Sequence, residues 1–393
     1  MALTSQSILR DRILVTLDSI EGANATRAET LAAIGEAFAT VWTSADLEPP
    51  KSRPWDTKWQ NRASFERADM VRDGLLVDRA DGIWALTTAG RQAADAVVTG
   101  AATARAAELA RRELMWSAIV AAGGPANLTP SVLNDLRTFR GGRGIYADGD
   151  STRGVLGSDG VAVSFLHNGS SYADELSTGG VRYHYPKTAV PGRDAAEISA
   201  GKAAYRFGLP IFVITTGTPE STRTVHRGYV EEYDDKLAMF LVTFEDGKLP
   251  PPPPATGGLP FSLTSDSDSE TSWGKRRSRP NQQRFAFQVM QRYGGECAAC
   301  GLAIPVLIQS AHLRSKKEKG SDDARNGLPL CANHHIAFDS GLWGIDPSTT
   351  LLVARTSGPS LVELGITRSN LHHLPQLPHV DALEHVWKGW KQP

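Results

Sequence analysis

The first 75 residues carry hydrophobic positions at the three- and four-residue spacing of amphipathic helices. Three such stretches predict helices over residues 5–20, 27–41 and 58–73. Thr26 and Glu29 have the spacing of a capping box at the start of the second stretch. Gly74 follows the third stretch, where glycine commonly ends a helix. The N-terminal part of the chain is therefore predicted to be mainly helical.

A different pattern follows, in which two short apolar runs flank Asp81-Gly82. An Asp-Gly pair between apolar runs predicts a tight β-hairpin. Three helices followed by a hairpin is the order of a winged-helix domain, which we expect over residues 1–100. The Ala-rich stretch that follows predicts a helix within a connector over residues 101–129.

Between residues 130 and 246 the chain becomes Gly-rich and favours strands. Short apolar runs such as VAVSFLH, LPIFVITTG and KLAMFLVTF are separated by turn residues. One helical stretch, Asp194 to Phe207, interrupts them. The pattern predicts a compact β-barrel with one helix packed against it.

Five consecutive prolines and then a Ser- and Asp-rich stretch mark residues 247–283 as a linker. Such a composition cannot bury enough apolar surface to fold, so the linker is expected to be stiff first and flexible after. Its end carries a basic cluster that suits phosphate contacts or serves solubility alone: Lys275, Arg276, Arg277, Arg279 and Arg284. The last domain is expected over residues 284–393.

Composition and charge narrow the class of protein. A chain of 393 residues is longer than one ordinary domain. Its charges nearly cancel, with 42 Lys and Arg against 43 Asp and Glu, so any contact with a polyanion must be local. No apolar run approaches the roughly 20 residues of a membrane span, and the N-terminus breaks its apolar positions with charges, unlike a signal peptide. We therefore expect a multidomain α+β protein in the cytoplasm.

All three cysteines of the chain lie close together in the last domain. Cys297 and Cys300 form a Cys-x-x-Cys pair, and Cys331 and His334 form a Cys-x-x-His pair further on. Two such pairs supply the four ligands that structural zinc prefers. A redox Cys-x-x-Cys would leave the second pair without a role. The clustering predicts a structural Zn²⁺ site.

Three further residues lie at a characteristic spacing: His312, then Asn326, then His335. Their order, with GSDDARNGLPLC between the zinc pairs, resembles the HNH nucleases over about residues 285–346. The resemblance implies a ββα-metal core, a hairpin followed by one helix, that cuts nucleic acid with one divalent ion, Mg²⁺ or Mn²⁺. A zinc ribbon that binds DNA without cutting it would need the zinc ligands but none of these three residues.

The reaction explains the residue types. Phosphodiester hydrolysis needs a base to deprotonate water and a cation to stabilise developing charge. His312 is the candidate general base, Asn326 would orient its imidazole, and His335 would hold the divalent ion. Many HNH nucleases have a second metal ligand directly before the base, where this chain has Ala311. Asp339, one helical turn after His335, is the local substitute, or else pairs with a basic neighbour.

Two other segments resemble known domains. Residues 59–94 resemble the winged helix of Mrr-type restriction enzymes, a module that binds DNA or serves protein contacts. Residues 140–216, with pieces such as GVRYHYPKT and GRDAAEISAGKAAYRFG, resemble the SRA domain. The second resemblance implies a PUA-like β-barrel over residues 130–246 that flips a modified cytosine into a pocket.

The SRA resemblance also implies which residues meet the nucleotide. The pocket would be formed by Tyr172, Asp174, Tyr183 and Tyr185. Aromatic faces would sandwich the base and a carboxylate would read its edge, although each tyrosine could instead pack inside the barrel. The candidate contacts to the DNA backbone are Arg140, Arg143, Lys275, Arg276 and Arg277.

Together these features predict a modification-dependent restriction endonuclease, similar to SRA-HNH enzymes. It would bind double-stranded DNA that carries 5-methyl- or 5-hydroxymethylcytosine and cut at a loosely fixed distance, because the linker is flexible. Two cuts need two active sites, so a homodimer is expected. Two alternatives stay open: an HNH restriction enzyme that reads unmodified sequence through the winged helix, and a non-catalytic reader of modified DNA.

Overall fold

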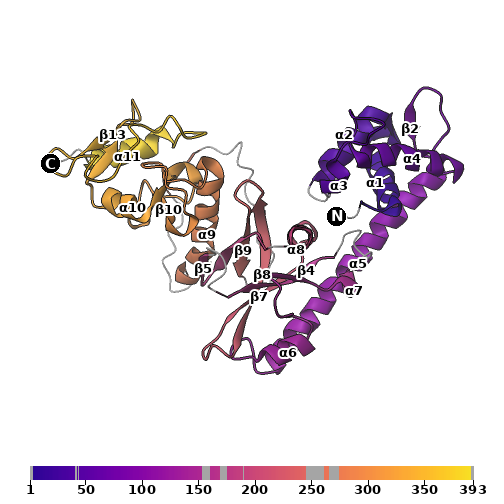
Figure 1. Ribbon diagram of the computed structural model, residues 1–393, viewed down its shortest axis with the longest axis horizontal. Coiled ribbons are helices and arrows are strands. Elements are labelled where there is room, and N and C mark those ends of the chain that lie inside the picture. Colours follow the sequence, from indigo (N-terminus) through magenta and orange to yellow (C-terminus); the bar gives the residue numbers. More distant parts are fainter. Residues whose placement is uncertain are drawn as a thin grey trace. The chain divides into compact units, whose positions relative to one another are not determined.

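The chain folds into two compact units of mixed α and β structure (Figure 1). The computed structural model describes residues 3–39, 42, 44–152, 160–168, 175–188, 190–244, 261–264 and 274–390. The first unit comprises residues 1–166, 186–212 and 217–224, and the second comprises residues 167–185, 213–216 and 225–393. Among the described residues, no helix is both long and apolar enough to cross a membrane.

The N-terminal elements of the first unit follow the predicted pattern. They are α1 (Gln6–Ser19), β1 (Asn24–Thr26), α2 (Arg27–Ala37), α3 (Ser44–Leu47), α4 (Lys58–Arg72) and β2 (Ile83–Ala85). The capping box at Thr26 and Glu29 is present, and Gly74 has φ +74° after α4, so both predicted helix ends are confirmed. Strand β2 pairs with β1. An isolated bridge between Leu76 and Leu86 joins the two sides of the predicted hairpin.

One long helix, α5 (Thr88–Ala121), follows without a break. The Thr87 side chain caps it by accepting a hydrogen bond from the backbone of Gly90. A side chain at Gly90 would meet the carbonyl of Leu75 at 2.1 Å, so only glycine fits where α5 crosses the end of the hairpin. The helix runs straight through residue 100, where the sequence pattern placed a boundary between winged helix and connector.

The rest of the first unit combines short strands with helices. The elements are α6 (Pro130–Asp135), β3 (Ile145–Ala147), α7 (Gly149–Thr152), β4 (Ala162–His167) and α8 (Pro191–Phe207). Strand β3 pairs antiparallel with β4, and α8 packs on β3. Helix α8 contains the predicted helical stretch and ends at Gly208, which has φ +55°.

Antiparallel strands form the sheet of the second unit. Its neighbouring strands are, in order, β8 (Arg223–Asp234), β9 (Met239–Phe244), β6 (Gly180–His184) and β5 (Glu175–Ser177). The last residues of β7 (Ile211–Thr216) also belong to the second unit. Residues of β6 and β9 are almost all buried, because both faces of these strands are covered.

Helix α9 (Gly274–Tyr293) joins this sheet to the C-terminal elements. Phe287 packs with Met239 and Leu241 of β9, and Arg284 forms a 2.5 Å ion pair with the buried Glu231 of β8. The end of the predicted linker, residues 274–283, is therefore helical rather than flexible. Apart from Phe261–Thr264, the rest of the predicted linker lies outside the described residues.

The C-terminal elements build around a β-hairpin and one helix. Their bounds are β10 (Ile308–His312), β11 (Gly327–Cys331), α10 (Ala332–Asp339), β12 (Trp343–Ile345), β13 (Leu352–Ala354) and α11 (Val380–Trp390). Strands β10 and β11 pair antiparallel, with His312 opposite Gly327. Trp343 is fully buried in the core of this part, and α11 packs on β12. The expected order of hairpin and then helix is present.

Candidate active site and metal centre

The four predicted zinc ligands come together. One ligand atom each of Cys297, Cys300, Cys331 and His334 lies within 4.8 Å of the others. His334 Nδ1 is 3.2 Å from the sulfur of Cys331 and 3.4 Å from that of Cys297. Ligand atoms in a tetrahedral site with bonds of about 2.0–2.3 Å lie roughly 3.3–3.8 Å apart. The geometry and the thiolate and imidazole donors therefore fit a zinc ion.

The backbone around these ligands is shaped for the site. The amide of Gly301 donates to the carbonyl of Cys297, and Gly301 has φ +74°, which closes a tight turn after Cys300. Nε2 of His334 lies 3.0 Å from the carbonyl of Leu364, so it carries the proton and leaves Nδ1 as the metal-binding atom. Burial raises the pKa of the Cys297 thiol, an effect that a bound cation opposes.

His312 lies at the end of β10 with its ring held on two sides. Its imidazole stacks on Phe285 of α9 with ring centroids 3.7 Å apart. Its Nε2 is 3.1 Å from Oδ1 of Asp322, whose other oxygen pairs with Lys316 at 2.8 Å. Within the described part of the chain, Nδ1 has no hydrogen-bond partner. With its proton on Nε2, the ring presents a basic nitrogen at Nδ1.

Asn326 is fully buried in η5 (Ala324–Asn326), directly before β11. Its amide accepts from the backbone of Arg314 and donates to the carbonyls of Arg314 and Ser321. Its own carbonyl accepts from Leu313. Asn326 thus closes the loop between the strands, and the partner of the imidazole is Asp322, which sequence reasoning missed. The loop holds two adjacent aspartates, and only its folding shows which one faces the histidine.

His335 lies on α10 beside Asp339, with 3.5 Å between Nε2 and Oδ2. Two donors at this separation are able to bind one hard cation together. Nδ1 of His335 is 2.8 Å from the side-chain oxygen of Gln309 on β10, so Nε2 is the nitrogen left for an ion. The sequence pattern did not predict a role for Gln309, because this residue is not part of the His-Asn-His motif. Ala311 is buried two residues later on the same face of β10 and offers no ligand atom.

Of the residues predicted for base recognition, the structure describes Tyr183 and Tyr185. Tyr172 and Asp174 lie outside the described residues. Tyr183 is 1% exposed on β6, opposite Phe240 of β9, which matches the packing alternative. The hydroxyl of Tyr185 donates to Asp235 at 2.9 Å and its ring packs on Phe240; burial and then this hydrogen bond raise its pKa.

The predicted phosphate contacts fall in two places. Arg140 and Arg143 line a cavity of the first unit, together with Arg137. Lys275, Arg276 and Arg277 lie in the first turn of α9, and the structure describes only their backbone. Of the predicted contacts to the DNA backbone, the structure therefore defines the surroundings only of the arginines around the cavity.

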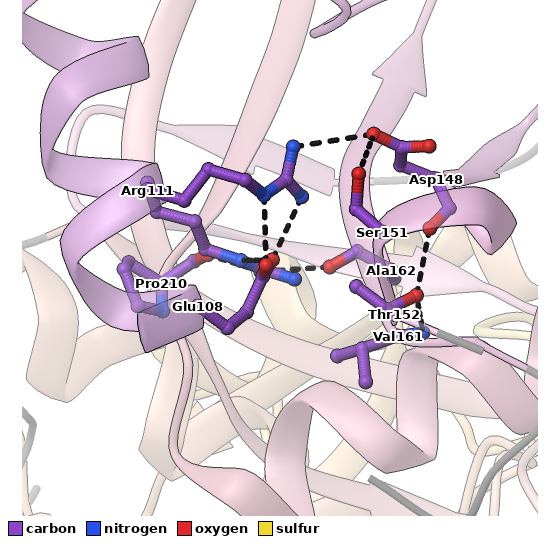
Figure 2. A network of polar contacts seen from close by, with 9 residues as sticks. Glu108, Arg111, Asp148, Ser151, Thr152, Val161, Ala162 and Pro210 are labelled. Carbon is purple, nitrogen blue, oxygen red and sulfur yellow. Dashed lines mark hydrogen bonds and ion pairs between the residues drawn. The ribbon is translucent and has the colours of Figure 1, made fainter. Parts of the chain in front are cut away.

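A buried polar network lies beside this cavity (Figure 2). Arg112 of α5 is fully buried; it pairs with Glu108 at 2.8 Å and donates to the carbonyls of Ala162 and Pro210. Arg111 binds Glu108 and reaches Asp148 at 3.2 Å. The network joins α5 to the segment that carries Asp148 and so sets the position of that carboxylate.

The comparison with protein families identifies the C-terminal site. Residues 297–346 match the family described as HNH endonuclease. This segment contains the metal cluster, the β10–β11 hairpin and α10, so it is an HNH endonuclease domain and the protein is an endonuclease. No curated protein sequence matches the chain.

Solved structures that resemble the chain at low identity include two restriction endonucleases. One is the modification-dependent TagI restriction endonuclease, with 15% identity and a TM-score of 0.28, covering 67% of this chain and 91% of TagI. The other is the type IV phosphorothioation-dependent restriction endonuclease ScoMcrA, with 14% identity and a TM-score of 0.21, covering all of this chain and 86% of ScoMcrA.

Proposed function

We propose that the protein is a modification-dependent restriction endonuclease that hydrolyses phosphodiester bonds of double-stranded DNA through its HNH domain. The observation that carries the proposal is the environment of His312. A histidine whose Nε2 is held by Asp322 while Nδ1 stays open is arranged to accept a proton from water. The His335–Asp339 pair supplies donors for a cation on the helix of the same motif.

In this proposal the residues divide the reaction between them. Nδ1 of His312 takes the proton of the attacking water, and stacking on Phe285 keeps the ring from rotating. Asn326 fixes the loop that presents Asp322. His335 and Asp339 would hold Mg²⁺ or Mn²⁺, which stabilises the charge developing on the phosphate and the leaving oxygen. Cys297, Cys300, Cys331 and His334 would hold structural Zn²⁺.

The other domains are assigned roles in target choice. The order α1, β1, α2, α4 and then the hairpin that includes β2 supports a winged helix, which would contact DNA. The antiparallel strands with α8 support an SRA-like barrel that would extract a modified cytosine, 5-methyl- or 5-hydroxymethylcytosine. A homodimer would place two active sites on the two strands, and the proposed site of action is the cytoplasm.

A cleavage assay tests this proposal. Methylated and unmethylated copies of one plasmid are incubated with the protein and Mg²⁺ or Mn²⁺, and the cut ends are sequenced. We expect cutting of the methylated plasmid alone, and none by the His312→Ala variant. Equal cutting of both plasmids would favour a nuclease that reads unmodified sequence. Binding without any nicking, unchanged by His312→Ala, would favour a non-catalytic reader.

A further inference from the structure

A short piece of the predicted linker, Phe261–Thr264, lies on the C-terminal elements although it is distant in sequence from the HNH motif. Its burial alternates along the chain. Phe261 and Leu263 are half-buried and pack against the core around Trp343, whereas Ser262 and Thr264 are exposed. This alternation is that of an extended strand with one face on a surface. We call residues 261–264 the strap.

The backbone of the strap binds the loop between β10 and β11. Thr264 forms an antiparallel bridge with Gly320, and the carbonyl of Leu263 accepts a hydrogen bond of 3.2 Å from the amide of Ser321. Ser321 directly precedes Asp322, whose carboxylate binds the imidazole of the proposed base. The strap therefore fixes the loop backbone on the N-terminal side of this carboxylate.

The ring of Phe261 fixes the loop on the C-terminal side of the same carboxylate. It stacks on His379 with 3.8 Å between the centroids, and the guanidinium of Arg325 lies over it at 5.2 Å. The amide of His379 donates to the carbonyl of Arg325 at 3.0 Å, so the three residues form one cluster. Arg325 follows Asp322 by three positions in the sequence. The strap thus holds the loop both before and after Asp322.

Asp322 depends on this restraint because its surroundings compete for it. Its side chain is 25% exposed, and Lys316 binds its second oxygen at 2.8 Å. Polar contacts at such an exposed position are weak, so a carboxylate on a freely moving loop would leave Nε2 of His312 for part of the time. The 3.1 Å contact between Asp322 and His312 therefore requires a loop backbone that is held in place.

We propose that the strap is a positioning segment of the nuclease site, in which Phe261 and Leu263 hold the loop so that Asp322 stays on Nε2 of His312. This rests on the proposed function, in which His312 takes the proton of the attacking water. The strap lies outside residues 297–346, the segment that matches the HNH family. Loss of its side chains slows the chemical step and leaves DNA binding unchanged.

A double-mutant cycle tests whether the strap acts through Asp322. Single-turnover cleavage by the full chain is measured on one DNA that the wild type cuts. We expect Phe261→Ala to lower the rate constant at least about threefold, with the DNA concentration at half-saturation unchanged. In the Asp322→Asn background the same change should have no further effect, because the contact that the strap protects is already lost. Phe261→Tyr keeps the ring and should restore the wild-type rate.

Two control variants separate positioning from a general loss of stability. Leu361→Ala removes a half-buried side chain that packs against the same core from another segment. It should lower the melting temperature, and its effect on the rate constant should multiply with that of Asp322→Asn. Gln309→Met acts on His335 instead of His312, so its effect should multiply with that of Phe261→Ala.

A measurement without cleavage follows the imidazole of His312 directly. Nuclear magnetic resonance is recorded on protein whose histidines carry nitrogen-15, at a pH where the ring is neutral, and His312→Gln assigns the signals. In the wild type, Nε2 should give the shift of a protonated nitrogen and Nδ1 that of an unprotonated one. In Phe261→Ala the two shifts should move toward each other, because the tautomers interchange once Asp322 leaves the ring.

The outcomes decide the proposal in either direction. It would be overturned by multiplying effects of Phe261→Ala and Asp322→Asn, or by wild-type imidazole shifts in Phe261→Ala. Full cleavage by His312→Ala would instead overturn the proposed function, while the imidazole shifts still decide whether the strap holds Asp322. Equal cutting of methylated and unmethylated plasmids affects none of these results, because all variants are compared on one DNA.

Discussion

The ring of His312 lies nearly parallel to that of Phe285, with 10° between the planes and 3.7 Å between the centroids. Phe285 comes from α9, which also packs on β6 and β9 of the sheet. The proposed base is therefore positioned by a helix outside the hairpin and α10 of the HNH motif. Together with Asp322, this stacking leaves the imidazole one orientation in which only Nδ1 is open.

Asp322 should matter for the rate of cleavage rather than for DNA binding. Asp322→Asn loses the charged acceptor for Nε2 of His312, so the ring no longer favours the tautomer with a basic Nδ1. We expect single-turnover cleavage to fall at least about tenfold, against roughly 10²–10⁴-fold for His312→Ala. Asp323→Asn is the matched control, because Asp323 pairs with Arg325 instead. Equal effects of the two aspartate variants would argue against a specific role of Asp322.

Removal of a zinc ligand should unfold the HNH domain. Cys300→Ser leaves three ligands, and structural zinc contributes on the order of 10 kcal/mol of folding free energy. We expect loss of bound zinc by elemental analysis and rapid amide exchange across residues 297–346. The Asp339→Ala variant should keep its bound zinc and the slow amide exchange of the wild type, but it should lose cleavage. A Cys300→Ser protein without zinc but with native exchange would show that the cluster is not a structural metal site.

Gln309 should tune the affinity for the divalent ion. Gln309→Met keeps the length of the side chain and removes the acceptor that orients His335. Loss of such outer contacts weakens metal binding by about 10–100-fold. We expect a corresponding rise in the Mn²⁺ concentration at half-saturation, measured by electron paramagnetic resonance and by cleavage. Ser310→Ala changes the opposite face of β10 and should leave both measurements unchanged. A shift of the same size in this variant would contradict the role assigned to Gln309.

Glu108 should make the first unit sensitive to acid. Burial acts to raise its pKa, but the hydrogen bond from Arg111 and the charge of Arg112 outweigh it, and the pKa lies below the ordinary value of 4.5. Because the pKa of Glu108 is lower in the folded state, its carboxylate stabilises the folded state above about pH 4.5. This contribution is lost as the pH falls through the pKa of the folded state.

The Glu108→Gln variant tests this. It leaves the buried Arg112 without a counter-charge and should cost roughly 3–5 kcal/mol of unfolding free energy at pH 7. Its stability should also vary less with pH below 4.5, as followed by urea denaturation. Glu113→Gln, on an exposed part of the same helix, should behave like the wild type. A pH dependence shared by all three proteins would assign the acid sensitivity to other groups.

The sequence by itself determined the four residues of the metal cluster, the HNH segment and most helices of the N-terminal part. These features are local: a capping box, two Cys-x-x-Cys-type pairs and a hairpin followed by a helix each depend on residues a few positions apart. Their chemistry follows from residue type and spacing alone, which is why the pattern of the chain predicts them.

Only the tertiary structure decided which groups these residues meet. Asp322, Gln309 and Phe285 act on the motif from a loop, from β10 and from a separate helix, and no spacing rule connects them to it. The same holds for α9, whose Phe287 packs on Met239 and Leu241 and which extends back into the predicted linker. Burial against distant residues is a property of the folded chain, so composition alone could not reveal it.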